Sequence, residues 1–477
     1  MLKNIEKKKL FISGKWHEGS ESYELKSPYD DEVIATVPLA NSREVEEALD
    51  SAEKGAQVIK NMTSLERSQI LEKASRVLEE RSEEAALILA KECAKPLKAA
   101  RAEIARTIET YKFAAEEAKR IHGETIPMDA AKNGKGRFAY TIREPLGIIA
   151  AITPFNFPYN LVAHKVGPAI AAGNSVVLKP ANQTPLSALL TAEIFEEAGL
   201  PAGVLNVVTG KGSVIGDLLV KDPRVKMVTF TGSLEVGLGI KEKTGLKKVT
   251  LELGSNSAVI VDSTDDLDSV VARCVEGAYG FAGQVCISVQ RIYVKYELYE
   301  QFVNKFIEKT KQLVIGDPMS EDTDLSAMIH QSEAERVEDW LHKAAKSGAV
   351  IAYGGKRDKA VLQPTIITEG SSKLSISCQE AFAPIVNITP YETLNEAIEF
   401  VNDSNYGLQA GIYTTSVQKA FDAAQRIEVG GVMINDIPTY RVDQMPYGGV
   451  KNSGTGREGI KYSVEEMTEL KLVTFKL

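Results

Sequence analysis

The feature that most constrains this chain is the alternation, beyond residue 145, of short apolar β-branched runs with segments long enough to be helices. Four such runs lie at residues 147–152, 175–178, 204–208 and 227–230. Continuous apolar strands separated by helices are typical of a parallel sheet that is covered by helices on both faces. The sequence therefore predicts an α/β lobe, of a size that suits a dinucleotide.

A second alternation indicates a second lobe of the same class. It begins at residues 258–261 and continues through residues 291–294 to residues 430–435. The chain has 477 residues, 44% of them hydrophobic, which is enough apolar material for more than one core. We therefore expect two large α/β lobes.

Helical periodicity marks the first part of the chain. Residues 42–60 and 64–93 have apolar side chains near helical spacing, with Ser42 and Ser64 as predicted N-caps, and a third helix is expected from about residue 95 to residue 121. The tail, residues 464–477, has alternating apolar and polar side chains. It predicts an edge strand, which a second copy of the chain would cover.

Charge and composition exclude several classes of function. The formal net charge is -9, and no long basic run is present, which argues against a nucleic-acid partner. No apolar stretch reaches the roughly 18 residues of a membrane span, and the polar start of the chain lacks a signal-peptide core, so a soluble cytoplasmic protein is expected. The four cysteines have neither disulfide nor zinc spacing, which favours reduced thiols and no metal.

Cys286 carries the clearest chemical signal. It lies shortly after Gly283, a residue type that permits unusual backbone geometry and the close approach of a ligand. A cysteine can be a nucleophile, although a buried cysteine is more often an inert small hydrophobic residue. Two other segments favour the catalytic interpretation.

Glu252 and Asn156 are the polar residues of those segments. Glu252 is the one carboxylate in the apolar strand pattern of residues 249–254, and it is either an ion-paired residue at a strand end or the general base that thioester hydrolysis requires. Asn156 lies among aromatic and proline residues after an apolar strand. Its amide either shapes the turn or donates a hydrogen bond to an oxyanion.

Taken together, these segments resemble the aldehyde dehydrogenase superfamily over essentially the whole chain. The motifs that carry the resemblance are Leu251-Glu252-Leu253-Gly254-Ser255-Asn256, Gly283-Gln284-Val285-Cys286, Pro154-Phe155-Asn156-Phe157-Pro158, Lys179-Pro180, Phe230-Thr231-Gly232-Ser233, Glu380-Ala381-Phe382-Ala383-Pro384 and Pro446-Tyr447-Gly448-Gly449-Val450-Lys451-Asn452-Ser453-Gly454. Ser255, Phe155, Ala381 and Ala383 differ from the usual family residues, but none of these differences removes a reactive group. The pattern is similar to the branch of lactaldehyde dehydrogenases and non-phosphorylating glyceraldehyde-3-phosphate dehydrogenases.

The resemblance implies an enzyme that oxidises a short aldehyde to its carboxylic acid. Cys286 attacks the aldehyde, the Asn156 side chain and the Cys286 backbone N–H hold the oxyanion, and hydride passes to the nicotinamide. Water activated by Glu252 then hydrolyses the thioester. Transfer of the acyl group to coenzyme A is an alternative, but family members of that kind tend to lack this glutamate. A non-catalytic use of the scaffold is a second alternative, which predicts the loss of a reactive group.

The implied cofactor is NADP or NAD. Its pyrophosphate would meet the helix that follows Gly232 and Ser233, Lys179 would bind the adenosine ribose, and Glu380 would bind the nicotinamide ribose. Asn182 replaces a glutamate that is common in NAD-preferring members, and a neutral amide does not repel a 2′-phosphate, so NADP should be used at least as readily as NAD. The full predicted cofactor set is Thr153, Pro154, Phe155, Lys179, Asn182, Gly212, Phe230, Gly232, Ser233, Val236, Gly254, Glu380 and Phe382.

At the substrate site, the resemblance places Arg106 and Arg441 at the mouth of a tunnel. They would form a clamp for a carboxylate, phosphate or sulfonate, as in succinate semialdehyde, glyceraldehyde 3-phosphate, sulfolactaldehyde or phosphonoacetaldehyde, whereas lactaldehyde needs no such clamp. Alternatively, Arg106 pairs with Glu103 or Glu109 and Arg441 with Asp443. The predicted lining residues are Arg106, Tyr159, Asn160, Val162, His164, Val285, Ile287 and Arg441, and no catalytic role is predicted for His164.

The resemblance also implies the domain boundaries. Residues 1–122 and 146–253 would form a Rossmann-like NAD(P)-binding domain, and residues 254–445 a Rossmann-like catalytic domain. Residues 123–145 and 460–477 would form a small β extension for oligomerisation. A homodimer or homotetramer is expected, without a choice between them.

Overall fold

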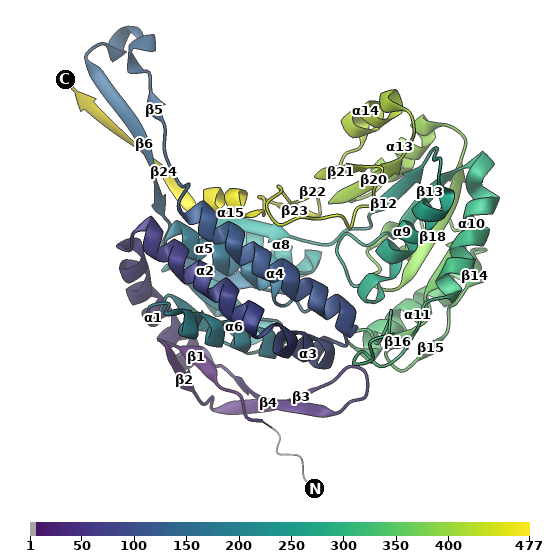
Figure 1. Ribbon diagram of the computed structural model, residues 1–477, viewed down its shortest axis with the longest axis horizontal. Helices are drawn as coiled ribbons and strands as arrows, with labels where there is room; N and C mark the ends of the chain where they lie inside the picture. Colours follow the sequence, from purple (N-terminus) through teal and green to yellow (C-terminus); the bar gives the residue numbers. More distant parts are fainter. Residues whose placement is uncertain (1–5) are drawn as a thin grey trace.

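The computed structural model describes residues 6–477. The predicted α/β class, with two lobes built on largely parallel sheets, is confirmed (Figure 1). Residues 1–5, where the predicted cofactor domain begins and where a signal peptide was not expected, lie outside the described residues. No helix in residues 6–477 is long and apolar enough to cross a membrane.

The first lobe is built on an eight-stranded sheet in the order β2-β1-β9-β8-β7-β10-β11-β23. Its parallel centre comprises β7 (Ile148–Ile152), β8 (Ser175–Lys179), β9 (Leu205–Val207), β10 (Val225–Thr231) and β11 (Lys248–Glu252). Its antiparallel edges are β1 (Leu10–Ile12) and β2 (Lys15–His17) on one side and β23 (Gly454–Thr455) on the other. All the strands that the sequence predicts for this lobe are present.

Helices cover both faces of this sheet (Figure 1). They are α1 (Ser42–Lys60), α2 (Ser64–Glu80), α3 (Ser82–Cys93), α4 (Leu97–Ala118), α5 (Asn160–Ala172), α6 (Pro185–Ala198), α7 (Asp217–Lys221) and α8 (Leu234–Lys243), with the π-helical turn η3 (Gly212–Gly216) before α7. Successive residues of β7 point to opposite faces. Ile149 packs in the core beneath α2 to α6, and Ile148 packs in the core beneath α1, α7 and α8.

The starts of the first two helices differ from the prediction by one residue. Asn41 and Thr63 are the N-caps, because each forms a capping box with the glutamate three residues later, Glu44 and Glu66. The single helix predicted over residues 64–93 is two helices. The chain leaves helical geometry at Arg81, where φ is -100° and ψ is 18°.

The second lobe is built on a seven-stranded sheet in the order β14-β17-β18-β13-β12-β20-β21. The strands are β12 (Ala258–Val261), β13 (Arg291–Lys295), β17 (Thr365–Thr368), β18 (Ile385–Tyr391), β20 (Gln409–Tyr413) and β21 (Gly431–Ile434), all parallel, and the antiparallel edge strand β14 (Val350–Tyr353). The helices are α9 (Leu267–Tyr279), α10 (Tyr296–Lys311), α11 (Gln331–Lys346), α12 (Ser375–Cys378), α13 (Leu394–Asn402) and α14 (Val417–Arg426). The three strands predicted from the second alternation are among them.

Smaller elements complete the chain. They are the hairpin of β3 (Glu21–Lys26) and β4 (Val33–Leu39), the pair β15 (Arg357–Asp358) and β16 (Val361–Leu362), the pair β19 (Tyr406–Gly407) and β22 (Val450–Lys451), and the 3-10 turns η1 (Met128–Ala130), η2 (Lys132–Gly134) and η4 (Gly280–Gly283).

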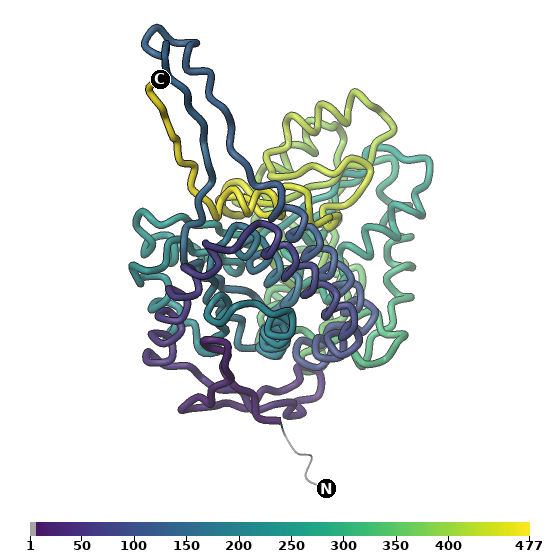
Figure 2. The backbone as a smooth tube through the Cα atoms, turned by 60° about the vertical axis from the view of Figure 1, so that its left-hand side comes forward, coloured from purple at the N-terminus to yellow at the C-terminus, as the bar shows by residue number. Residues whose placement is uncertain are grey.

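A three-stranded arm projects from the body of the molecule (Figures 1 and 2). It consists of β5 (Thr125–Ile126), β6 (Arg137–Pro145) and the C-terminal strand β24 (Thr468–Lys476), in the order β24-β6-β5. β24 pairs with β6 over the whole length of both strands. The predicted strand region 460–477 is partly wrong, because residues Ile460–Glu466 form a helix, α15, that packs on α5 before the strand begins.

Candidate active site

The candidate cofactor and base residues follow neighbouring strands of the first sheet. Lys179 ends β8, Thr153 follows β7, Thr231 ends β10 and Glu252 ends β11. These strands are adjacent and parallel, so their carboxyl ends lie at one edge of the sheet. Open α/β sheets bind ligands at this edge.

The second lobe contributes loops that precede its strands. Cys286 lies between η4 and β13, and Glu380 lies shortly before β18. The two lobes meet here, because Asn156 Nδ2 from the first lobe donates a hydrogen bond to the Gln284 carbonyl of the cysteine loop at 2.9 Å. The carboxyl edge of one sheet and the amino edge of the other therefore build one site.

Cys286 differs from the other cysteines in its polar contacts. Its Sγ lies 3.1 Å from the hydroxyl of Tyr447, whereas Cys93 and Cys274 lie in apolar cores and Cys378 is the last residue of α12. Burial raises the pKa of the Cys286 thiol to about 11, and the Tyr447 hydroxyl and the Arg441 charge oppose that rise. Burial raises the pKa values of Cys93 and Cys274 further.

A buried ion pair holds the loop that carries Asn156. Lys95 Nζ pairs with Glu103 and also donates to the Asn156 carbonyl at 2.7 Å. The same ammonium lies 3.9 Å from the ring centroid of Phe157 and 4.4 Å from that of Phe281. A buried ammonium needs several such partners to offset its lost hydration. The Asn156 amide is thus fixed close to Cys286 by its own backbone as well as by Gln284.

Glu252 lies in an environment that suits a general base. It is 2% exposed, and within residues 6–477 neither of its carboxylate oxygens has a hydrogen-bond partner. Burial, reinforced by the nearby Glu458 carboxylate, raises its pKa well above the usual range. A raised pKa makes a carboxylate a better base towards water.

Glu458 belongs to a buried charge cluster behind Glu252. Lys165 Nζ lies 2.7 Å from Glu458 Oε1, and Arg441 donates from Nη2 to Glu458 Oε2 at 3.3 Å. Burial alone would raise the pKa of Glu458, but the cations of Lys165 and Arg441 lower it to about 2. Arg441 also stacks on Tyr447, with its Cζ 3.6 Å from the ring centroid. Its Nε is buried and has no partner among the described residues.

The predicted local pairings of the two arginines are wrong. Arg106, and not Arg441, pairs with Asp443, at 2.7 Å between Nη2 and Oδ1, and Arg441 pairs with Glu458. The reason is that Glu103 is already the partner of Lys95, and the Asp443 carboxylate faces α4 and α5. Asp443 accepts further hydrogen bonds from Asn160 at 3.1 Å and from His164 at 2.8 Å.

Other predicted lining residues divide into two groups. Ile287 packs with Tyr447, Val285 and Cys286 in a small apolar cluster beside the thiol. Tyr159 and Val162 instead belong to the apolar core of the first lobe. Burial, reinforced by the Glu92 carboxylate, raises the pKa of Tyr159 well above its usual value. Glu92 itself accepts a hydrogen bond from the backbone N–H of Leu186 at the start of α6. Packing therefore explains Tyr159 better than the predicted place in a tunnel lining.

The candidate cofactor residues form a cradle with free polar groups. Within the described part of the chain, the hydroxyls of Thr153 and Thr231 and the amide oxygen of Asn182 are buried without hydrogen-bond partners. Among the described residues, Lys179 Nζ bonds only the Pro180 carbonyl, at 3.1 Å, and burial lowers the pKa of Lys179 to about 8. These groups are available to a bound polar ligand.

Glu380 lies where the two lobes meet. A Cβ at Gly254 would overlap its carboxylate, and the Ser255 backbone N–H donates to its Oε1 at 3.0 Å. Burial raises the pKa of Glu380 to about 7. The other predicted cofactor residues lie around this edge. Phe155, which follows Pro154, makes an edge-to-face pair with Phe382, and Gly212 begins η3 beside Lys179. Phe230 packs against Gly232, and Ser233 and the half-exposed Val236 lie at the start of α8.

The comparison with known proteins decides the family. The model of the Aldehyde dehydrogenase family matches residues 16–473. The chain belongs to the aldehyde dehydrogenase family. It is thus an NAD(P)-dependent oxidoreductase, and the family predicted from its motifs is confirmed.

Several relatives of this aldehyde dehydrogenase span the whole chain. It is 49% identical to the 3-sulfolactaldehyde dehydrogenase of Priestia megaterium over 100% of this chain and 99% of the relative. It resembles aldehyde dehydrogenase 21 of Physcomitrella patens, solved with the reaction product succinate, at a TM-score of 0.97 and 40% identity over 99% of both chains. It resembles glyceraldehyde-3-phosphate dehydrogenase of Methanocaldococcus jannaschii, solved with NADP, at a TM-score of 0.92 and 41% identity over 96% of this chain and 100% of the other.

Four residues of the site, Lys95, Lys165, Tyr447 and Glu458, were given no role in the sequence analysis. Lys165 is the only charged residue of the apolar helix α5, and such a residue needs a buried partner, here Glu458. Tyr447 lies in a quoted motif but was given no role. Lys95 precedes a proline at a helix start, which gives no hint of its contact with Asn156.

Proposed function

We propose that this aldehyde dehydrogenase oxidises a short aldehyde with an anionic group at its far end to the free carboxylic acid. The observation that carries the proposal is Arg441. Its side chain is 7% exposed, makes one long hydrogen bond to Glu458, and leaves its Nε without a partner in the described residues. An arginine that is buried and incompletely bonded is suited to a carboxylate, phosphate or sulfonate.

The chemistry assigned to the chain begins at Cys286. Its thiolate would attack the aldehyde carbon, and the resulting oxyanion would accept hydrogen bonds from Asn156 Nδ2 and from the Cys286 backbone N–H. In residues 6–477, no acceptor takes a hydrogen bond from that N–H, so it is available. One N–H of the Asn156 amide bonds the Gln284 carbonyl, and the other is left for the substrate.

Glu252 would complete the reaction by taking a proton from the water that hydrolyses the thioester. Its unpartnered, buried carboxylate supports that role. Lys165 and Arg441 hold Glu458 ionised behind it, so a proton taken up by Glu252 is favoured by the adjacent negative charge. Release of a free acid, rather than of a coenzyme A ester, follows from a base at this position.

The free polar groups at the edge of the first sheet fit a nicotinamide dinucleotide. Bound NAD or NADP would supply the hydride acceptor. Lys179 and Glu380 would hold its two riboses, and the first turn of α8, after Gly232 and Ser233, would meet its pyrophosphate. Asn182 carries no charge to repel a 2′-phosphate, so we expect NADP to be used at least as readily as NAD.

The names of the relatives agree with an anionic or hydroxylated substrate. They mention sulfolactaldehyde, glyceraldehyde 3-phosphate and the reaction product succinate. Each of the three molecules carries an anionic group a few atoms from the reacting carbon. Lactaldehyde, which appears in the name of a further relative, carries a hydroxyl group but no anionic group.

The test is a comparison of substrates by the absorbance of reduced nicotinamide. Sulfolactaldehyde, succinate semialdehyde and glyceraldehyde 3-phosphate would be compared with lactaldehyde and propionaldehyde, with NAD and NADP side by side and Cys286→Ala as the control. We expect higher kcat/KM for an anionic aldehyde, a free acid as product and no activity in the control. Equal kcat/KM for neutral and anionic aldehydes would contradict the substrate class, and activity that requires coenzyme A would contradict the hydrolytic step.

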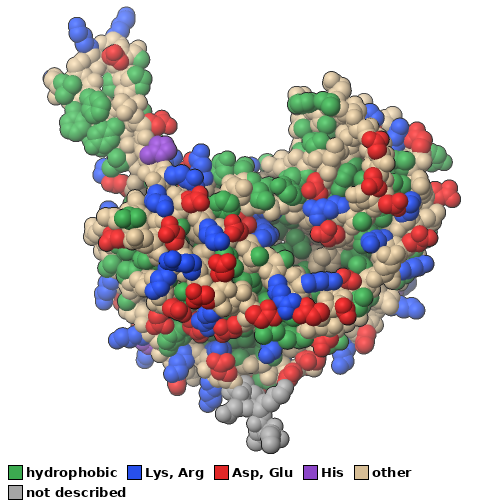
Figure 3. Space-filling model, viewed as in Figure 1, with side chains coloured by type: hydrophobic (Ala, Val, Ile, Leu, Met, Phe, Trp, Pro, Cys, Tyr) green, Lys and Arg blue, Asp and Glu red, His purple; other side chains and the backbone are tan. Residues whose placement is uncertain are grey.

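We further propose that the arm docks on a second copy of the chain. β24 exposes the apolar side chains of Leu470, Leu472 and Phe475, and the arm stands clear of the body (Figure 3). β24 and β21 are both edge strands, and exposed edge strands are normally covered. Because the arm points away from its own second lobe, a partner is the natural source of that cover.

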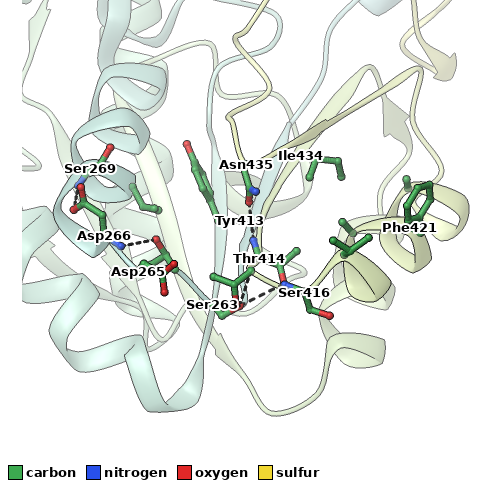
Figure 4. Close-up of a pocket in the computed structure, with 16 residues that line it drawn as sticks. Ser263, Asp265, Asp266, Ser269, Tyr413, Thr414, Ser416, Phe421, Ile434 and Asn435 are labelled. Atoms are coloured by element: carbon green, nitrogen blue, oxygen red, sulfur yellow. Dashed lines mark hydrogen bonds between the residues drawn. The ribbon is translucent and has the colours of Figure 1, made fainter.

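The second lobe offers an apolar surface that suits such an arm. A cavity of about 770 Å³ lies at the carboxyl ends of β12 and β20, on the edge of the sheet opposite to the Cys286 loop. Phe421 and Ile434 line its apolar side and are 64% and 41% exposed, while Asp265 and Ser263 lie on its polar side (Figure 4).

Light scattering should give a dimer or tetramer for the native chain and a smaller particle for Leu470→Glu/Leu472→Glu. Tyr296→Ser on α10 is the control, and a native monomer would contradict the proposal.

A further inference from the structure

Tyr447 connects the buried arginine to the reactive thiol. It is 3% exposed and belongs to the segment after β21 that returns to the first lobe. Its hydroxyl lies 3.1 Å from Cys286 Sγ, and the Arg441 Cζ lies 3.6 Å from its ring centroid. Arg441 thus lies on the face of the phenol ring, and the hydroxyl at the edge of that ring reaches the sulfur atom.

The hydroxyl acts as the donor once the thiol has lost its proton, because a thiolate can only accept a hydrogen bond. Burial raises the pKa of Tyr447 well above its usual value, so the phenol keeps its proton. A cation on the face of the ring draws electron density from it, which makes the O–H group a stronger donor. The thiol proton itself must leave to another acceptor, either water or a carboxylate.

The charges around Cys286 explain why a donor is needed there. Glu252 and Glu380 both disfavour the thiolate, and so does burial. The Tyr447 hydroxyl and the Arg441 charge oppose them. A hydrogen bond that exists in full strength only with the thiolate favours ionisation of the thiol.

We propose that Tyr447 is a further catalytic residue, which donates a hydrogen bond to the Cys286 thiolate and is strengthened as a donor by Arg441 on its ring face. The proposal rests on the proposed function, in which Cys286 is the nucleophile. Its test uses the reactivity of the thiol alone. The two can therefore fail separately. An active Cys286→Ala enzyme would contradict the nucleophilic role of Cys286, whereas the effect of Tyr447 on the thiol is measured in enzyme that keeps Cys286.

The hydrogen bond has two opposite effects on the rate of attack. Each unit by which the thiol pKa falls raises the thiolate fraction about tenfold at pH values below the pKa. The same change lowers the intrinsic nucleophilicity about threefold, for a Brønsted coefficient of about 0.4–0.5. Loss of the hydroxyl should therefore slow the reaction near neutral pH and should not slow it at high pH. A role in packing alone predicts no such crossover.

The experiment measures alkylation of Cys286 by iodoacetamide across pH in the full-length enzyme, quantified on the peptide that contains residue 286. In Tyr447→Phe, which keeps the ring and the stack, we expect the apparent pKa of the thiol to rise by about one unit or more. The alkylation rate at pH 7 should fall about threefold or more, and the two pH profiles should cross at high pH. Tyr413→Phe is the control, because the Tyr413 hydroxyl has no partner in the described residues.

Two further variants keep the proposal open to disproof. A 3-fluorotyrosine at position 447 is a more acidic phenol, and it should lower the apparent pKa of the thiol. Arg441→Met should raise that pKa, and by less in a Tyr447→Phe background than in the native chain. An unchanged thiol pKa in Tyr447→Phe, or the same rise in Tyr413→Phe, would overturn the proposal.

Discussion

The two arginines that approach the site differ in how completely the protein satisfies them. Arg106 on α4 is about one third exposed and makes two hydrogen bonds to the Asp443 carboxylate, at 2.7 and 3.3 Å. Arg441 is almost fully buried, makes one hydrogen bond of 3.3 Å and keeps an unpartnered Nε. A buried donor without a partner is costly, so a protein that retains one gains something else from it.

The difference assigns separate tasks to two residues that have the same chemistry. The Asp443 carboxylate already accepts hydrogen bonds from the Arg106 guanidinium. This arginine therefore helps to hold α4, α5 and the C-terminal loop together. Arg441 has spare donors beside Cys286, and these are available to a ligand. In place of the clamp predicted from the sequence, we expect one binding arginine and one structural arginine, a division that the following variants test.

The largest effect is expected for Arg441→Ala with an anionic aldehyde. Removal of one partner of a buried charge pair costs about 2–5 kcal/mol, so kcat/KM should fall on the order of a hundredfold or more. The ratio of kcat/KM for succinate semialdehyde to that for propionaldehyde is the measurement. This ratio separates binding of the anion from the effect of Arg441 on Tyr447, because the latter affects both substrates equally. An unchanged ratio would exclude Arg441 as the anion site.

An intermediate effect is expected for Asp443→Asn, and it should appear in stability. Burial would raise the pKa of Asp443, but hydrogen bonds from His164 and Arg106 hold it well below the usual range. A depressed pKa stabilises the fold above the unfolded-state value near 4, and this contribution is lost as the pH falls through the lower folded-state pKa. The variant should lose about 2 kcal/mol at pH 7, and the loss should shrink below about pH 4.

Thermal midpoints of the native chain and Asp443→Asn at pH 7 and at acidic pH measure this difference. A midpoint lowered by roughly a few degrees at pH 7, with a smaller gap in acid, is the expected result. A difference between the two midpoints that is the same at both pH values would mean that the charge of Asp443 contributes nothing to stability.

The smallest effect is expected for Arg106→Ala. A partly exposed ion pair is worth up to about 1 kcal/mol, so kcat/KM for the anionic aldehyde should fall less than about tenfold. The ratio of anionic to neutral substrate should stay near the native value. A loss of specificity as large as that of Arg441→Ala would show that both arginines bind the substrate, and the comparison would then be wrong.

Local patterns in the sequence were sufficient for most of the fold. The apolar runs at residues 148–152 and 258–261 are typical of buried parallel strands, because their side chains are apolar on both faces. The starts of the first two helices were predicted to within one residue, since Asn41 and Thr63 stand beside the serines that were chosen. The break at Arg81 was missed because nothing in the local spacing interrupts the apolar periodicity.

The pairing of charges could not be predicted in the same way. Arg106 and Asp443 are 337 residues apart in the chain, and Lys165 and Glu458 are 293 apart. Which acid reaches which base depends on how α4, α5 and the C-terminal loop pack, and no local pattern encodes that arrangement. The catalytic and cofactor roles of Cys286, Glu252 and the other candidates remain predictions, now with a geometry that supports them.

The antiparallel strand β23 has a consequence for synthesis of the protein. It pairs with β11 at Glu252, which the ribosome makes about 200 residues earlier, roughly 10–40 s before Gly454 emerges at 5–20 residues per second. During that interval, the nascent first lobe has an open sheet edge next to Glu252. Codon choice and chaperone supply over the second lobe should therefore affect the yield of active enzyme more than the same changes near the N-terminus.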